Sequence, residues 1–128
     1  MKVRVNVSSV SGGQQFNTSS IGELTIGEDE FSVHYYSEGD ECRLTVRGEE
    51  VTQQRRGNLG FEMRFRENED TLCILREGER EFPVPLHTFA LGISLSDDGC
   101  SVALRYALGD IATELVFTAE RIGKQLRS

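Results

Sequence analysis

Three cysteines and two histidines are the side chains that could serve a hydrolytic or redox enzyme as nucleophile and base. The composition allows Cys42 or Cys100 to pair with His34, and His87 follows a proline-containing stretch, but no local motif specifies any of these partners. The chain contains no G-x-S-x-G, phosphate-binding loop, G-x-G-x-x-G or H-E-x-x-H sequence. We therefore predict no catalytic residue, and an enzyme that uses cysteine or histidine ranks last of three functional hypotheses.

The spacing of Cys42, Cys73 and Cys100 argues against a shared structural role. The cysteines are scattered, odd in number and never arranged as C-x-x-C, so neither a disulfide framework nor a zinc site is indicated. Free thiols in the strands of a protein in a reducing compartment are the expected outcome. We predict no metal ligand and no cofactor.

A different kind of site is indicated at residues 51–56, where polar side chains occupy both faces of an expected strand. This segment leads through Gly57, Asn58 and Leu59 into residues 60–66, where Phe61, Met63 and Phe65 form an apolar row. In any hairpin between the two segments, some polar side chains of the first must face the same side as this row.

The length of the connecting loop decides which polar side chains these are. A two-residue loop places Arg56 and Gln54 opposite Phe61 and Met63. A three-residue loop places Arg55 and Gln53 there instead, and we favour it because Val51 then faces Phe65. In either register an arginine and a glutamine face the apolar side.

A guanidinium buried without a partner would cost several kcal/mol, so water, a carboxylate or a ligand must lie beside it. In the simpler interpretation Arg55 lies at a hydrated barrel mouth or pairs with a nearby glutamate. In the sharper interpretation the barrel interior is a partly polar pocket for a small anionic or amphipathic ligand. The residues predicted to bind that ligand are Arg55, Gln53, Phe61, Met63 and Tyr106.

The elements that would position these residues are short strands, because apolar residues recur at every second position along most of the chain. Turn sequences such as Glu38-Gly39-Asp40 and Asp97-Asp98-Gly99 separate them, and no helical periodicity stands out. Residues 8–20 form a polar passage rich in glycine and serine. About ten short strands are expected, at residues 2–7, 23–26, 31–36, 41–47, 51–56, 60–66, 72–75, 89–95, 102–108 and 111–117, beside a proline-containing segment at 82–86.

Strands joined by turns at such spacing predict an all-β, antiparallel meander. Because an open sheet of this many strands would leave exposed edges, we expect one closed barrel of about eight to ten strands. A flattened sandwich is the competing geometry. The barrel is expected to span residues 1–122, with a short basic C-terminal tail at 123–128.

Pro83 and Pro85 lie two residues apart and remove ladder donors on the same side of one strand, so their stretch must be an edge, a bulge or a connection. This edge, or an outer sheet face, is the surface for the second hypothesis. In that hypothesis the protein is an interaction module that meets a partner chain or a second copy, so that it is a monomer or a homodimer.

The 128 residues carry a formal net charge of −7, which disfavours general nucleic-acid binding because phosphate contacts require a surplus of lysine and arginine. No segment approaches the roughly 20 apolar residues of a membrane span, and the first residues alternate without the apolar block of a signal peptide. We expect no nucleic-acid partner, no membrane partner and a cytoplasmic location.

The chain resembles the YwiB-like family of uncharacterised bacterial proteins. The residues that carry the likeness are Arg55 and Gly57, Met63 and Phe65, and Tyr106 and Leu108. The resemblance covers roughly residues 2–122 and implies a calycin-like, that is lipocalin-like, β-barrel. Members commonly have a Thr-Pro-x-Gly stretch where this chain has Phe82-Pro83-Val84-Pro85, which leaves that turn unassigned. The family implies no activity, so the first hypothesis remains non-enzymatic binding of a small molecule.

Overall fold

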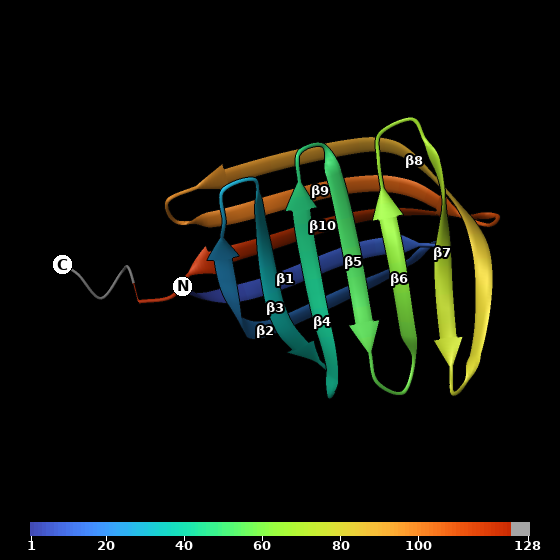
Figure 1. The fold of residues 1–128 in the computed structure, drawn as a ribbon, viewed down its shortest axis with the longest axis horizontal. Coiled ribbons are helices and arrows are strands. Elements are labelled where there is room, and N and C mark those ends of the chain that lie inside the picture. Colours follow the sequence, from blue (N-terminus) through green and yellow to red (C-terminus); the bar gives the residue numbers. More distant parts are fainter. Residues whose placement is uncertain (124–128) are drawn as a thin grey trace.

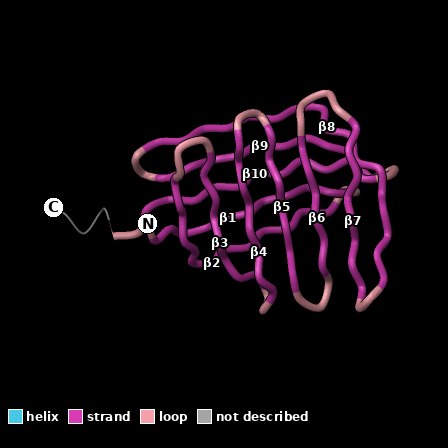
Figure 2. Tube along the Cα trace, in the orientation of Figure 1, coloured by secondary structure: helices cyan, strands magenta, loops and turns pink. Residues whose placement is uncertain are grey.

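A computed structural model of the chain describes residues 1–123, which form strands and tight turns without any helix (Figures 1 and 2). The ten strands are β1 (Lys2–Ser11), β2 (Gln14–Ile26), β3 (Glu30–Ser37), β4 (Asp40–Arg47), β5 (Glu50–Arg56), β6 (Gly60–Phe65), β7 (Asp70–Glu77), β8 (Arg80–Ser96), β9 (Gly99–Leu108) and β10 (Ile111–Arg121). Within the described residues no helix is long and apolar enough to cross a membrane.

Each strand pairs antiparallel with the next along the chain, and β1 pairs with β10 over Val3–Ser11 to close the sheet. The predicted all-β meander barrel is confirmed, and the ten strands lie at the upper end of the expected range. Pairing of the first strand with the last leaves no open border of the kind that a two-sheet sandwich would have.

The barrel is flattened into two layers whose strands cross at a steep angle (Figure 1). Strands β3 to β7 form one layer, which we call the front layer, and β9, β10 and β1 lie in the other, the back layer. Strands β2 and β8 bend and belong to both: β2 pairs with β1 up to Glu23 and with β3 from Gly22, whereas β8 pairs with β7 up to His87 and with β9 from Leu86. These two corner strands close the barrel.

The core lies between the layers and is built from the inward-facing residues of each strand. Aromatic rings meet across it: Tyr35 of β3 packs on Phe117 of β10 at 5.7 Å between ring centroids, and Phe65 of β6 on Tyr106 of β9 at 4.9 Å. Phe117 and Phe65 are fully buried. Side chains therefore fill the middle of the barrel, as is usual for small barrels.

The polar passage at residues 8–20 differs from expectation, because it consists of the ends of two long strands. β1 continues to Ser11, β2 begins at Gln14, and only Gly12 and Gly13 turn, both at positive φ. Residues 14–19 of β2 are exposed at every position, and Ser8, Ser9 and Ser11 of β1 are only half-buried, so this part of the hairpin contributes little to the core. The missing alternation reflects this low burial and not a loop.

The expected segments 82–86 and 89–95 are one strand, β8, with a bulge between Thr88 and Ala90. Pro83 and Pro85 pair with β7 on one side, whereas pairing with β9 begins only at Leu86 on the other. The proline stretch is a local edge within a closed barrel, which is one of the three environments predicted for it.

The strands run from Lys2 to Arg121, and the Ile122 N–H donates to the Lys2 carbonyl at 3.1 Å. Of the basic tail expected at 123–128, only Gly123 is among the described residues, so that expectation lies outside them.

Candidate functional site

The β5–β6 hairpin has the three-residue loop that the pattern favoured. Val51 pairs with Phe65, Gln53 with Met63, and Arg55 with Phe61. Val51 and Phe65 are fully buried, so this register places both Gln53 and Arg55 on the inward face of the barrel. An arginine therefore does lie in the apolar row.

The row that contains Arg55 continues on both sides through the cross-strand pairs of the front layer. In order across the layer it consists of Tyr35, Cys42, Arg55, Phe61, Leu75 and Phe82, and we call it the Arg55 row. Exposure rises along it: Tyr35 is 4% exposed, the Arg55 side chain 23% and Phe82 43%. One inward-facing row thus passes from the core to solvent.

Strand β2 bounds the same end of the barrel in the back layer. β2 bends beside Tyr35 at Gly22, where a Cβ would lie 2.7 Å from the His34 carbonyl oxygen, and only glycine permits this close approach. Before the bend, β2 runs behind the front strands, whose turns project past it (Figure 1). Its inward-facing Phe16 is 53% exposed. We call this end of the molecule the Arg55 end of the barrel.

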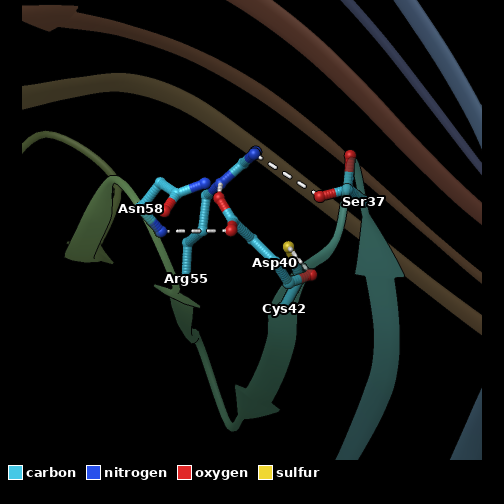
Figure 3. A network of polar contacts seen from close by, with 5 residues as sticks. All are labelled: Ser37, Asp40, Cys42, Arg55 and Asn58. Carbon is cyan, nitrogen blue, oxygen red and sulfur yellow. Dashed lines mark hydrogen bonds and ion pairs between the residues drawn. The ribbon is translucent and has the colours of Figure 1, made fainter.

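The partner of Arg55 is Asp40, and not a glutamate. The Arg55 Nε donates to Asp40 Oδ2 at 2.9 Å, and its Nη2 donates to the Ser37 carbonyl at 3.5 Å (Figure 3). Asp40 Oδ1 accepts the Asn58 backbone N–H at 3.2 Å. The hydrogen bond from Arg55, followed by the one from Asn58, holds the pKa of Asp40 below its usual value. The two residues tie the β3–β4 turn to the β5–β6 turn.

Gly57 makes this contact possible. Its φ is +152°, and a Cβ there would lie 1.8 Å from Asp40 Oδ1. No side chain fits in that space, so the backbone of the β5–β6 turn and the Asp40 carboxylate lie against each other.

The guanidinium keeps donor capacity beyond this pair. Arginine has five N–H groups in a planar fork, and within residues 1–123 the Nη1 group donates to no protein acceptor. Its row neighbour Phe61 is half-buried. A charged donor with free N–H groups beside the half-buried ring of Phe61 is suited to an amphipathic anion.

Gln53 and Met63 lie one row deeper, at 9% and 7% exposure. Burial raises the pKa of Tyr35 to about 12, and a hydrogen bond with Gln53 offsets only part of that rise. At neutral pH the phenol is therefore protonated and Gln53 has a neutral neighbour. Gln53 and Met63 therefore lie between Arg55 and the centre of the core.

The structure brings four of the five predicted site residues together and places the fifth elsewhere. Gln53, Arg55, Phe61 and Met63 are adjacent on β5 and β6. Tyr106 faces inward from β9 and is 6% exposed, packed against Phe65. Periodicity indicated its face correctly but could not show which side chain it would meet.

Three members of the Arg55 end escaped sequence reasoning: Asp40, Leu75 and Phe82. Asp40 was interpreted only as part of a turn. The two-residue turn at Gly48-Glu49 fixes the pairing of Cys42 with Arg55, and it is the signal that could have revealed Asp40 as a neighbour of Arg55. Phe82 belongs to the proline stretch, whose strand pairing the sequence left open.

The cysteines and histidines do not form the pair that catalysis would need. Cys42, Cys73 and Cys100 are free and buried, and burial raises the pKa of each, that of Cys100 to about 11. Cys42 faces inward, whereas His34 lies on the outer face and contacts Glu41 at 2.7 Å. In the described part of the chain no group of three or more metal-ligating side chains occurs.

Comparisons with known proteins agree with this architecture. Residues 1–116 match the family model described as Domain of unknown function (DUF1934). The crystal structure of the ywiB protein from Bacillus subtilis is similar with a TM-score of 0.80 at 18% sequence identity, covering 94% of this chain and 91% of that one. Among proteins with curated descriptions none matches. At this identity the structural likeness speaks for the fold alone, and it agrees with the expected resemblance to YwiB. Because the model spans most of the sequence, the chain belongs to the DUF1934 family.

Proposed function

We propose that this protein is a non-enzymatic binder of a small anionic or amphipathic molecule at the Arg55 end of its barrel. In this proposal the Arg55 guanidinium contacts the anionic group, and Phe61 and Phe82 contact the apolar part. The observation that supports it is the Arg55 row, in which a partly buried cation stands between core residues and exposed inward-facing rings.

Energetics favour an occupant there. Asp40 balances the charge of Arg55, so the site is stable when empty, and the free Nη1 hydrogens remain available for a charge-assisted hydrogen bond. Phe82 is 43% exposed on the inward side of its strand, where a ligand could cover it. Binding would thus add contacts without first breaking the ion pair.

Anilinonaphthalene sulfonate, an amphipathic anion whose fluorescence rises in apolar surroundings, tests the proposal. The folded protein is expected to bind it saturably, and Phe82→Ser is expected to weaken binding about tenfold, because one partly buried ring contributes about 1 to 2 kcal/mol. Phe89→Ser is the matched control, since Phe89 is 42% exposed but lies on the outer face beside Arg105.

Equal weakening by both substitutions, or no saturable binding by the wild type, would refute the proposal. Native mass spectrometry of protein purified from its own host addresses the natural occupant. Retention of a small anion that is lost in Phe82→Ser and kept in Phe89→Ser is the expected outcome.

A further inference from the structure

The outer surface of the back layer carries two complete rows without a charged residue. Cross-strand pairing through β8, β9, β10, β1 and β2 defines them. One row is Ser94, Ser101, Thr118, Asn6 and Ser19; the other is Gly92, Ala103, Val116, Ser8 and Asn17. We call them the uncharged rows. They lie on the side of the back layer that faces away from the core.

The outer surface of the front layer is different, because charges cover it. There His34 pairs with Glu41, Arg64 contacts Glu50, and Gln54 donates to Glu62. A chain with a net charge of −7 and 27% charged residues has thus kept two adjacent rows of one sheet face free of charge. Surfaces that stay in water do not need this, whereas the centres of interfaces are depleted of charge.

Small side chains leave a depression on this face. A depression of about 390 Å³ is lined by residues that include Ala90, Gly92, Ala103 and Val116, with the charged residues Glu67, Arg105 and Glu114 also in its lining. Val116 is 49% exposed and projects beside the hollow. One molecule therefore presents both a projecting apolar side chain and an apolar depression, as a self-complementary surface requires.

We propose that a second copy of this chain packs on this face, sheet against sheet, about a two-fold axis parallel to the strands between β9 and β10. This axis brings Val116 of each copy over Ala103 of the other. The same operation brings each Thr118 over Ser101 and each Asn6 over Ser94.

Charge complementarity selects this axis. Arg105 and Glu114 are cross-strand neighbours on β9 and β10, next to the uncharged rows. Rotation about the proposed axis places each Arg105 beside Glu114 of the other copy, which forms two equivalent ion pairs at the rim. An axis centred on β10 would instead oppose the two Glu114 carboxylates.

The size of the face is adequate. Strands lie about 4.8 Å apart and same-face residues about 6.8 Å apart, so five strands and four rows, the two uncharged rows with the charged row on each side, cover roughly 650 Å² in projection. A standard interface buries about 800 Å² of each partner, and side-chain relief adds to the projected area. Exposed Val10 of β1, the cross-strand neighbour of Glu114, continues the apolar surface at its rim.

Sedimentation equilibrium of the purified protein at micromolar concentrations tests the inference. The wild type is expected to be a dimer, and Val116→Arg a monomer, because it places a charge in the central hollow. Arg105→Glu should weaken dimerisation about tenfold or more, since like charges then meet at both rims. The exchange Arg105→Glu with Glu114→Arg should restore it, and Arg43→Glu on the front layer should have no effect.

Circular dichroism and thermal melting of each variant separate dissociation from unfolding. A monomeric wild type overturns the proposal, as does a dimer that survives Val116→Arg or one that dissociates with Arg43→Glu. Failure of the double exchange to restore the dimer in a folded variant would overturn the proposed axis.

Discussion

Replacing Gly57 by alanine tests the tie between the two turns at the Arg55 end. The new Cβ would lie 1.8 Å from Asp40 Oδ1, whereas ordinary contacts begin at 3.4 Å, so one of the two must move by 3.4 − 1.8 = 1.6 Å. Such a shift breaks the 3.2 Å bond from Asn58 and the 2.9 Å bond from Arg55. Backbone strain at the φ of +152° adds about 1 to 3 kcal/mol, to which the lost hydrogen bonds contribute further.

Thermal melting followed by circular dichroism measures the effect, which is expected to be a fall in Tm of at least about 5 °C. Gly39→Ala is the control, because Gly39 has a φ of +85° but nothing lies within 4 Å of its added Cβ. In an Asp40→Ala background, Gly57→Ala should cost less than in the wild type, because the carboxylate is gone and only the Cβ of residue 40, at 3.0 Å, adds to the backbone strain. The reasoning is refuted if Gly57→Ala costs no more than Gly39→Ala in the wild-type background.

Two further predictions concern titration and thiol chemistry. Because Arg55 lowers the pKa of Asp40 in the folded state, this carboxylate stabilises the fold above its ordinary pKa of 3.8, and that contribution is lost as pH falls through the lower folded value. Arg55→Gln should therefore flatten the rise of the denaturation midpoint with pH in this acidic range, and an unchanged slope would contradict the assignment. Burial raises the pKa of all three thiols, so Cys42, Cys73 and Cys100 should react slowly with a disulfide reagent at neutral pH and rapidly after denaturation; fast labelling of a folded thiol would reopen the enzyme hypothesis.

Alternation predicted most of the fold because the strands of the front layer and of the centre of the back layer bury one face against each other and expose the other face. Val51 opposite Phe65 was enough to choose the hairpin register. Prediction failed at residues 8–20, which are strands that bury little: residues 14–19 are exposed at every position, and Ser8, Ser9 and Ser11 are only half-buried. It failed again at Phe89, which alternates with Leu91 but lies on the outer face because the bulge after Thr88 shifts the period.

The candidate site was predictable only in part for a related reason. That Arg55 shares a face with Phe61 follows from one loop length. That Asp40 is its partner depends on the register of a second hairpin and on the space left by Gly57. The exposure of Phe82 depends on where β8 leaves one layer for the other, and no local pattern encodes that corner.

Closure by β1 and β10 has a consequence for synthesis. Val3 pairs with Arg121, so the ladder that completes the barrel joins the first strand to emerge from the ribosome with the last. Until β10 is available, β1 and β9 each have an unpaired backbone edge that can pair with other chains. We expect nascent chains that lack β10 to depend on holdase chaperones, and this dependence to end once β10 has left the ribosome and paired with β1.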